Sequence, residues 1–498
     1  MMDVKKDYYI ILDIGSMATE TEIRRAYRDL ARQYHPDVNP EPEANLKFHA
    51  LQEAYEVLGN PDQRKKYDRL RVHEGLEQAS ALSLRALVSH PILQHLSHDQ
   101  AYYVRLDITP DQGLPTSRLP LNLCLVVDRS TSMQGRRIQQ IKEAIRQIID
   151  KLQPQDALSL VTFSDRAEVL IEGQQNIDKT RAKSMISTIQ PAGGTEILPA
   201  LEAGLKEIAR QRSQNSVNHL ILLTDGQTYG DESDCIDKAR WAGSQGIQFS
   251  TIGIGSDWNE NLLDKMASLS GGISIYIDSP EKIRTVFDET MQNLETVVAR
   301  NLTMKLNLNP NVRLHEVFQI SPQISRLSTR NDKTTLGALS LGQQQSLLLE
   351  FRVKGLAVGE HRVMRVTVEG DIPSQAKHRP WEWVEISVKV SESPLLNVEI
   401  PPPVTDALSK LAMFKMQEKV SNDIEVGQLE RATQRLKLLA TQLLDIGETN
   451  LAHAAMLEAG QLTRTRALSP EGRKTIHYGT RSLSLVPKQA IHLDPIPA

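Results

Sequence analysis

Residues 120–132 read PLNLCLVVDRSTS, an apolar run that ends in an acidic residue and is followed by hydroxyl side chains. A short, almost continuous apolar run is typical of a strand buried on both faces of a parallel sheet. Three more runs share this character: ALSLVTF (157–163), NHLILLTD (218–225) and IQFSTIGIG (247–255). Amphipathic segments with helical periodicity separate these runs. The alternation over residues 119–298 therefore predicts an α/β unit with a doubly wound, mostly parallel sheet.

Side chains that carry oxygen follow the ends of the predicted strands. Asp128, Ser130 and Ser132 come after the first strand, Asp225 closes the 218–225 strand, and Thr195 lies in a loop after two glycines. Ligands of doubly wound sheets bind beyond the carboxyl ends of the strands. Two carboxylates and three hydroxyls are hard donors, which suit octahedral Mg²⁺ or Mn²⁺ and suit zinc or copper poorly. The sequence therefore predicts a divalent-metal site at this edge, with one position left for the carboxylate of a partner.

The order of these residues, Asp-x-Ser-x-Ser, then Thr, then Asp, resembles the metal-ion-dependent adhesion site of the von Willebrand factor A domain. The resemblance implies a set of five metal ligands: Asp128, Ser130, Ser132, Thr195 and Asp225. Thr131 stands where many members of the family have Gly. Each residue alone has an ordinary explanation, since a serine can cap the next helix and two glycines can form a turn. The inference rests on their order and on their shared place at strand ends.

Residues 7–70 predict a small helical unit. Thr19 and Glu22 have the spacing of a capping box, and apolar residues follow at helical period. Pro36 disfavours the helical conformation at His35, so we expect this helix to end there. A second amphipathic run ends at Gly59, and the two runs predict an antiparallel helical hairpin with residues 35–37 at its tip. The face of the first helix opposite its apolar stripe is basic, with Arg24, Arg25, Arg28 and Arg32.

The segments DYYIILDI (7–14), IRRAYRDLARQYHPDVN (23–39) and KFHALQEAYEVLGNPDQRKKYD (47–68) resemble the J domain of DnaJ-type co-chaperones. The resemblance implies that His35, Pro36 and Asp37 trigger ATP hydrolysis by a DnaK-type 70-kDa heat-shock chaperone. It also implies a docking face for that chaperone, formed by Arg24, Arg25, Arg28 and Arg32. Guanidinium groups on a rigid helix suit an acidic partner surface. An arginine stripe without the neighbouring motif would be an ordinary solvated face.

The flanking segments predict β-structure and then helices. Residues 300–392 alternate apolar with polar at period two, which predicts an antiparallel β-sandwich. Residues 82–88 and 101–109 alternate in the same way, so we expect them to join the sandwich and the α/β unit to be an insertion in it. This arrangement resembles bacterial A-domain proteins related to the inter-alpha-trypsin inhibitor heavy chains. Helical periodicity resumes over residues 404–420, 424–446 and 449–463 and predicts a C-terminal helical hairpin.

The expected fold class is thus multi-domain, with an all-α J domain, a doubly wound α/β A domain, an antiparallel β-sandwich and a C-terminal helical hairpin. The expected division is a J domain over 1–75, a linker with the first sandwich strands over 76–118, the A domain over 119–298, the rest of the sandwich over 299–394, a helical region over 402–484 and a flexible tail over 485–498.

The composition excludes several classes of protein. The chain has 498 residues, of which 40% are hydrophobic and 24% charged, as expected of a globular protein with several domains. A net charge of −4 leaves no basic excess for nucleic acid. The N-terminal apolar run is too short for a secretory segment, and no stretch reaches the roughly 18 apolar residues of a membrane span. Two cysteines build neither a disulfide framework nor a zinc module. We therefore expect a cytoplasmic protein that binds neither nucleic acid nor membrane.

These features favour a co-chaperone adaptor. Its J domain would stimulate the chaperone, its A domain would select a protein client or complex, and the chain itself would be no enzyme and have no catalytic residue. One alternative is a metal-dependent scaffold, assembled with an AAA-type ATPase, in which the J module is inactive. The intact His35-Pro36-Asp37 motif disfavours that alternative. A metal-dependent hydrolase is disfavoured because the motifs place no His or further carboxylate as a general base.

Overall fold

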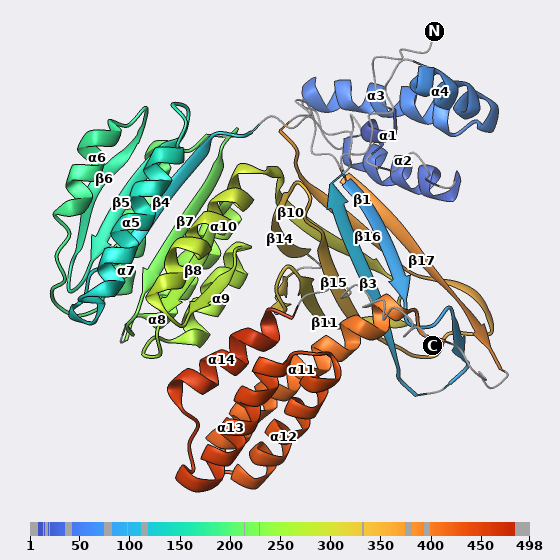
Figure 1. Ribbon diagram of the computed structural model, residues 1–498. Helices are drawn as coiled ribbons and strands as arrows, with labels where there is room; N and C mark the ends of the chain where they lie inside the picture. Colours follow the sequence, from blue (N-terminus) through green and yellow to red (C-terminus); the bar gives the residue numbers. More distant parts are fainter. Residues whose placement is uncertain are drawn as a thin grey trace, which may run out of the picture. The chain divides into compact units, whose positions relative to one another are not determined.

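The computed structural model describes residues 8–12, 14, 18, 20–34, 42–73, 82–96, 98–110, 118–213, 215–228, 230–330, 333–373, 381–392 and 399–483 (Figure 1). The chain divides into two compact units, Met1–Ala81 and Leu82–Ala498, which are described separately. Within these ranges, no helix combines the length and the apolar character needed to cross a lipid bilayer.

The first unit is helical, with α1 (Tyr8–Ile11), α2 (Glu20–Tyr34), α3 (Pro42–Leu58) and α4 (Pro61–His73). α2 and α3 contact each other, as their amphipathic patterns predict. Tyr8 and Tyr67 are fully buried, and the backbone N–H of Tyr8 donates to the Tyr67 hydroxyl over 2.9 Å. The ring of Tyr27 on α2 stacks on that of Tyr55 on α3, with 4.2 Å between the ring centroids. The Tyr8–Tyr67 contact thus joins α1 to α4, and the Tyr27–Tyr55 stack joins α2 to α3.

The α/β part of the second unit is built on a six-stranded sheet with the order β6-β5-β4-β7-β8-β9. Its strands are β4 (Leu121–Asp128), β5 (Ala157–Phe163), β6 (Ala167–Gln175), β7 (Val217–Thr224), β8 (Ile247–Ile254) and β9 (Ser274–Ile277). β6 pairs antiparallel with β5, and the other neighbours pair in parallel. One face packs against α5 (Arg136–Lys151), α6 (Lys179–Ser187) and α10 (Ile283–Glu295). The other packs against α7 (Ile197–Arg210), α8 (Glu232–Ser244) and α9 (Glu260–Ser270), so the sheet is doubly wound, as predicted.

Two more sheets form the sandwich, with the orders β1-β3-β15-β11-β12 and β13-β14-β10-β16-β17-β2. Their strands are β1 (Leu82–Val88), β2 (Ile92–Gln94), β3 (Gln100–Pro110), β10 (Val297–Leu308), β11 (Val312–Ser321), β12 (Ser325–Leu327), β13 (Thr329–Arg330), β14 (Lys333–Ser340), β15 (Gln345–Val353), β16 (Gly359–Asp371) and β17 (Trp381–Ser391). β3 pairs with β15, with Leu106 opposite Leu347. Strands from before and after the α/β part therefore share a sheet, and the α/β part is inserted between them.

One strand departs from the expected antiparallel pattern. β2 pairs in parallel with β17, with Leu93 opposite Val390. β2 has only three residues, too few to show a periodic signal, and its partner comes almost 300 positions later in the chain. Its direction therefore could not be inferred from alternation.

The C-terminal region is helical, as its periodicity predicts, with four helices among the described residues. α11 (Pro402–Glu425), α12 (Leu429–Asp445) and α13 (Thr449–Thr465) pack in succession, and α14 (Pro470–Arg481) returns to α11 and to β9 of the α/β sheet. Leu411 and Phe414 of α11 pack with Phe318 and Leu348 of the sandwich. On α12, Leu436, Leu439, Ala440 and Leu443 are buried, whereas Leu444 is 54% exposed. Residues 484–498, which include the expected tail, lie outside the described part of the chain.

Candidate metal centre

The site begins where β4 and β7 end. These strands are neighbours in the sheet, with Val127 opposite Leu223, so Asp128 and Asp225 emerge at the same edge. After β4 the chain forms a short 3₁₀ helix, η1 (Thr131–Met133), between Ser130 and the start of α5. The edge expected from parallel-strand topology is thus the edge at which these residues lie.

Hydrogen bonds join the first loop to the second carboxylate. The backbone N–H of Ser130 donates to Asp128 Oδ1 over 2.7 Å. The hydroxyl oxygens of Ser130 and Ser132 lie 3.0 Å apart, and Ser132 Oγ donates to Asp225 Oδ1 over 2.6 Å. The structure therefore brings together four of the five residues that the sequence singles out, in a geometry that turns several oxygens toward one another.

Thr195 belongs to a loop that packs beside this group. The backbone N–H and the hydroxyl of Thr131 both donate to the carbonyl of Gly193, each over 3.1 Å. Thr131 thus fits the loop without the glycine that many relatives of this motif have. A Cβ atom on Gly226 would lie 2.6 Å from Thr195 Oγ1, so Thr195 is against the residue that follows Asp225. The absence of a side chain at Gly226 lets the two loops meet.

The charges of the site are unbalanced. Asp128 is completely buried and Asp225 is 1% exposed. Burial raises the pKa of Asp128 to about 6, although hydrogen bonds from Thr224 and Ser130 act in the opposite direction. Asp225 pairs with the guanidinium of Arg137, which is the only ion pair of either carboxylate among the described residues. Two buried carboxylates with one monovalent partner, surrounded by hydroxyl oxygens, fit a hard divalent cation.

Two residues of the site are missing from the sequence-based set. Thr224 Oγ1 donates to Asp128 Oδ2 over 2.6 Å, and Arg137 holds Asp225 from the first turn of α5. Thr224 directly precedes Asp225, and this position at the end of a strand is the feature of the sequence that could have indicated it. Arg137 is one of two adjacent arginines, and sequence alone does not distinguish it from Arg136.

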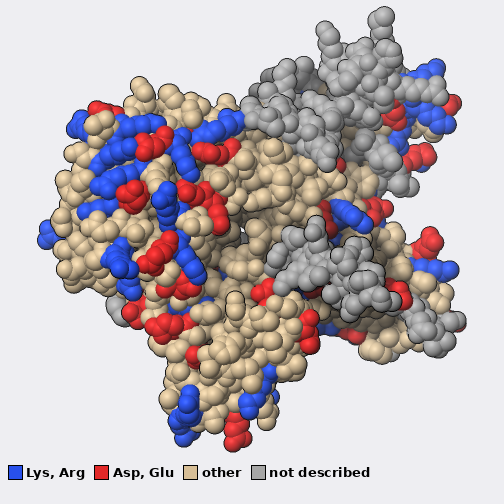
Figure 2. Space-filling model, in the orientation of Figure 1, with Lys and Arg blue, Asp and Glu red and all other residues tan. Residues whose placement is uncertain are grey.

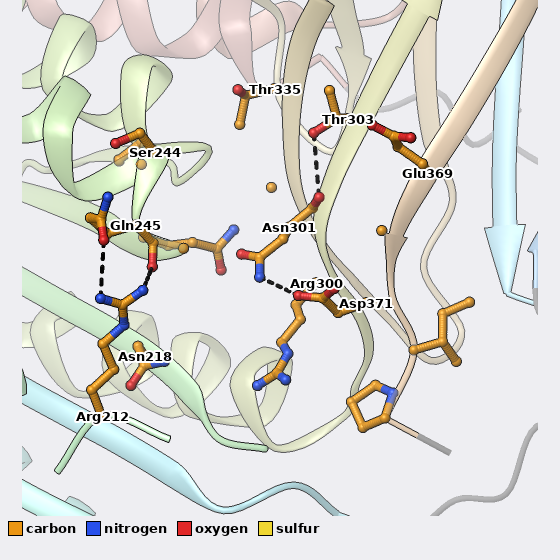
Figure 3. A pocket seen from close by; sticks show the side chains of 18 of the residues that line it. Arg212, Asn218, Ser244, Gln245, Arg300, Asn301, Thr303, Thr335, Glu369 and Asp371 are labelled. Carbon is orange, nitrogen blue, oxygen red and sulfur yellow. Dashed lines mark hydrogen bonds between the residues drawn. The ribbon is translucent and has the colours of Figure 1, made fainter. Parts of the chain in front are cut away.

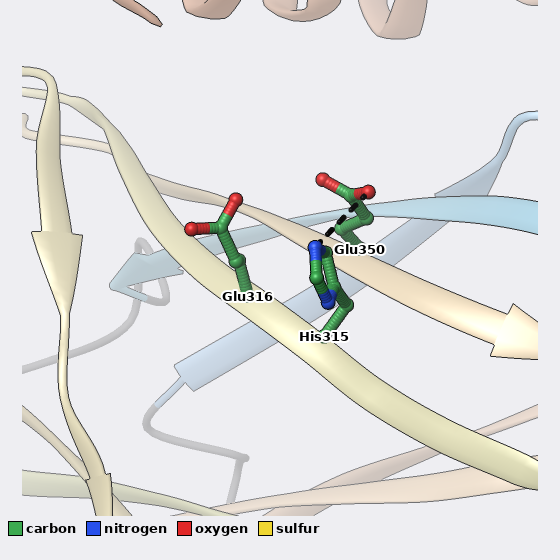
Figure 4. Close-up of side chains that lie close together, drawn as sticks. All are labelled: His315, Glu316 and Glu350. Atoms are coloured by element: carbon green, nitrogen blue, oxygen red, sulfur yellow. Dashed lines mark ion pairs between the residues drawn. The ribbon is translucent and has the colours of Figure 1, made fainter. Parts of the chain in front are cut away.

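A second group of possible ligands lies in the sandwich. His315, Glu316 and Glu350 offer ligand atoms within 4.8 Å of one another (Figure 4). Lys415 of α11 donates to Glu316 over 2.7 Å and to Glu350 over 3.1 Å, and Arg352 donates to Glu350 over 2.7 Å. Because cations of the chain already neutralise both carboxylates, this group joins α11 to β11 and β15 and has no excess negative charge for a metal.

A pocket of about 840 Å³ lies at the other edge of the α/β sheet, between the starts of β7 and β8 and strands β10, β14 and β16 (Figure 3). Arg212 donates to the side chain and the backbone carbonyl of Gln245, over 3.1 and 2.8 Å. Asn301 Nδ2 donates to Asp371 Oδ2 over 2.5 Å. Several polar groups of this pocket thus bind one another, and none of the metal ligands named above lines it.

The surface charges of the α/β part are mixed. On the face shown in Figure 2, basic and acidic side chains alternate over this part of the molecule. Within the α/β part, Lys151 is paired with Asp288 over 2.7 Å, and Lys183 is paired with Asp150. That face does not have the uniformly basic character typical of a nucleic-acid-binding surface.

In the first unit, the four arginines of the predicted docking face are all exposed on α2. Arg24 pairs with Glu20, and Arg25 lies 3.8 Å from Asp29. Arg28 and Arg32 follow along the same helix. His35, Pro36 and Asp37 lie outside the described residues.

Three family models match separate parts of the chain. Residues 122–289 match the von Willebrand factor type A domain, residues 7–68 match the DnaJ domain, and residues 402–486 match the Sll0103-like, C-terminal alpha-helical domain. The predicted combination of a J domain and an A domain is thereby confirmed. The third match covers the helices α11 to α14.

Individual proteins are similar to different parts of the chain. The chain is 30% identical to protein sll0103 of Synechocystis over 375 residues, which are 71% of this chain and 88% of that protein. It is 58% identical to chaperone protein DnaJ 2 of Thermus thermophilus over 67 residues, which are 14% of this chain and 24% of that protein. It is 32% identical to inter-alpha-trypsin inhibitor heavy chain H4 of Bos taurus over 216 residues, which are 40% of this chain and 23% of that protein.

A solved structure shares the fold of most of the chain. The von Willebrand factor type A protein from Catenulispora acidiphila aligns with a TM-score of 0.67 at 17% identity, over 82% of this chain and 98% of that one. At this identity the likeness concerns the fold alone. Because the alignment covers 82% of this chain, the shared fold includes more than the α/β part.

Proposed function

The chain belongs to the family of von Willebrand factor type A proteins that includes sll0103 of Synechocystis, and since it also carries a DnaJ domain, we propose that it is a cytoplasmic co-chaperone adaptor. Its J domain stimulates the ATPase of a DnaK-type 70-kDa heat-shock chaperone. Its A domain recruits a protein client or complex through a divalent metal. The chain performs no chemistry of its own, because the partner hydrolyses the ATP and the J domain shifts that partner's conformational population.

The geometry at the ends of β4 and β7 is the observation that carries the recruiting half of this proposal. Asp128, Ser130, Ser132 and Asp225 would hold Mg²⁺ or Mn²⁺, with Thr195 beside them. A bound ion would supply an electrophilic centre for a carboxylate of the client. Thr224 fixes the orientation of Asp128. Because Asp128 and Asp225 are buried, little water reaches their carboxylates.

The chaperone half is supported by the first unit. Its J-domain segment is 58% identical to that of a DnaJ protein, and its four α2 arginines are exposed. Exposed guanidinium groups on one rigid helix steer an acidic surface into register. His35, Pro36 and Asp37, which follow α2 in the sequence, would trigger hydrolysis.

The decisive experiment is single-turnover ATP hydrolysis by a bacterial DnaK, with the full chain and with His35→Gln. Stimulation by the wild-type chain that is lost in the variant supports the proposal. If neither protein stimulates while a control J protein does, the co-chaperone function is wrong for that chaperone, and the metal-dependent scaffold becomes the leading function.

The recruiting half has its own test. Partners captured by the wild-type chain in Mg²⁺ are compared with those captured by Asp128→Ala and by the wild-type chain in EDTA. We expect both changes to abolish the same captures, while the ATPase stimulation by the J domain remains. Unchanged capture in both conditions would contradict metal-dependent recruitment.

A further inference from the structure

Arg137 occupies the side of Asp225 that the serines leave open. Its guanidinium pairs with Asp225 Oδ2, while Asp225 Oδ1 accepts the hydroxyl of Ser132 over 2.6 Å. Arg137 Nη1 also lies 3.3 Å from the carbonyl oxygen of Ser132. The guanidinium therefore lies directly beside the predicted metal ligands, on the carboxylate that has to help neutralise an incoming ion.

The charges at the site put Arg137 and a divalent ion in competition. Asp128 and Asp225 carry at most two negative charges, and within the described residues Arg137 is their only ion-pair partner. An added divalent ion would raise the positive charge to three. At separations of a few ångströms in a partly buried site, the ion and the guanidinium repel each other strongly.

We propose that Arg137 is a built-in counter-cation: it neutralises Asp225 in the metal-free site, and it has to release Asp225 when a divalent ion binds. The inference rests on the proposed metal-binding function. Arg137 thereby lowers the metal affinity of the site and stabilises the metal-free protein, so that metal is held only while its concentration is high or a client carboxylate adds negative charge.

The surroundings of Arg137 permit this exchange. Its side chain is 32% exposed, so the guanidinium has a path into solvent. Gly255 leaves room beside it, because a Cβ atom there would lie 2.8 Å from Arg137 Nη2. The adjacent Arg136 supplies a matched control: its side chain is 87% exposed and lies 3.4 Å from Glu281, away from the metal ligands.

The test is the Mn²⁺ dissociation constant of the full chain, measured from the electron paramagnetic resonance signal of free Mn²⁺. We expect Arg137→Gln to bind Mn²⁺ about tenfold more tightly than wild type, and Arg137→Lys and Arg136→Gln to stay within about twofold of it. Without metal, Arg137→Gln should unfold at a lower temperature than Arg136→Gln, and Mn²⁺ should raise its midpoint more than that of wild type.

Three of the other outcomes would overturn the inference. Equal, measurable affinities of wild type and Arg137→Gln would show that Arg137 does not compete with the ion. Weaker binding by Arg137→Gln would show that the guanidinium orients Asp225 for the ion. If neither protein bound Mn²⁺, the proposed metal centre would fall together with the inference, whereas binding by Arg137→Gln alone would support the competition in its strongest form.

Discussion

Thr224 and Asp128 end two neighbouring strands and are joined by a hydrogen bond of 2.6 Å from the threonine hydroxyl to the carboxylate Oδ2. The same hydroxyl accepts the backbone N–H of Gly226 over 3.1 Å. One side chain therefore fixes both the carboxylate at the end of β4 and the turn that follows β7. Thr224 therefore orients the edge at which we propose that a metal binds, although it is not among the proposed ligands.

Thr224→Val should consequently weaken the site without removing a ligand. The change leaves a buried carboxylate oxygen without its donor, so we expect about tenfold weaker Mn²⁺ binding and a loss of roughly 1.5–3 kcal/mol in the free energy of unfolding. Thr441→Val on α12, whose hydroxyl donates to a helix carbonyl, is the matched control. Retention of both affinity and stability in Thr224→Val would argue against this role.

Metal binding should weaken in mild acid. Burial raises the pKa of Asp128 to about 6, and only the ionised carboxylate binds a metal ion. At about pH 5 roughly nine in ten of these carboxyls are protonated in the metal-free protein, so the Mn²⁺ dissociation constant should be about tenfold higher than at about pH 7. Calorimetric titration at both pH values checks this expectation. A constant affinity down to pH 5 would mean that Asp128 ionises as an ordinary carboxyl does.

His219 on β7 should make stability depend on pH by a separate route. Its Nε2 lies 2.9 Å from the Ser250 hydroxyl, and burial lowers its pKa from 6.5 to about 4. The unfolded chain therefore takes up a proton before the folded chain does. This contribution to stability is complete above about pH 6.5 and is lost as the pH falls toward 4, roughly 3 kcal/mol in all.

Urea unfolding at several pH values isolates that contribution. His219→Gln should lose less stability than wild type between about pH 6.5 and pH 4.5, whatever its stability at neutral pH. The exposed His453 supplies the control, since His453→Gln should follow the wild-type slope. Parallel slopes of wild type and His219→Gln would contradict the assignment.

Asp264 should be essential for the attachment of α14 to the α/β part. It accepts the Tyr478 hydroxyl over 2.7 Å and His477 Nε2 over 2.8 Å, and it pairs with Arg481. Burial alone would raise the pKa of Asp264, but the Arg481 guanidinium and these hydrogen bonds hold it well below its usual range. The stabilisation is thus present above about pH 4 and lost only in stronger acid.

Asp264→Asn leaves the guanidinium of Arg481, whose side chain is 6% exposed, without its charge partner. We expect a loss of about 3 kcal/mol in the free energy of unfolding, because breaking a buried pair strands the remaining charge. Asp278→Asn, which breaks an exposed pair with Lys282, should cost less than about 0.5 kcal/mol. Urea unfolding followed by tryptophan fluorescence compares the two variants. Equal, small losses would mean that α14 is held by its apolar contacts.

Much of the fold could be read from local patterns. The apolar runs of β4, β5, β7 and β8 are long enough to identify strands, and parallel strands bring their carboxyl ends to one edge, so Asp128 and Asp225 could be placed together from spacing alone. The alternation of residues 101–109 likewise indicated a half-buried strand, and the structure pairs it with β15.

The remaining contacts depend on the tertiary arrangement. From its sequence, Lys474 is expected to be a solvated residue on an amphipathic helix, yet it is fully buried. Its Nζ lies 3.5 Å from the centre of the Trp258 ring and donates to the Trp258 carbonyl over 2.6 Å. Arg137 and Arg136 are equivalent in sequence and differ only because Asp225 arrives beside one of them. Side-chain period along one helix carries no information about which distant carboxylate will meet it.

The insertion of the α/β part between β3 and β15 also delays the pairing of these two strands during synthesis of the chain. The hydroxyl of Ser346 donates to Asp107 across a separation of 239 residues. At about 5–20 residues per second, the ribosome needs roughly 12–48 s to make the intervening chain. Throughout that interval the β1–β3 hairpin presents an unpaired strand edge, the type of surface on which nascent chains associate wrongly. The first sheet can therefore be completed only after the chain between β3 and β15, which includes the α/β part, has been translated. Slow codons in that stretch would lengthen the exposure of the β3 edge.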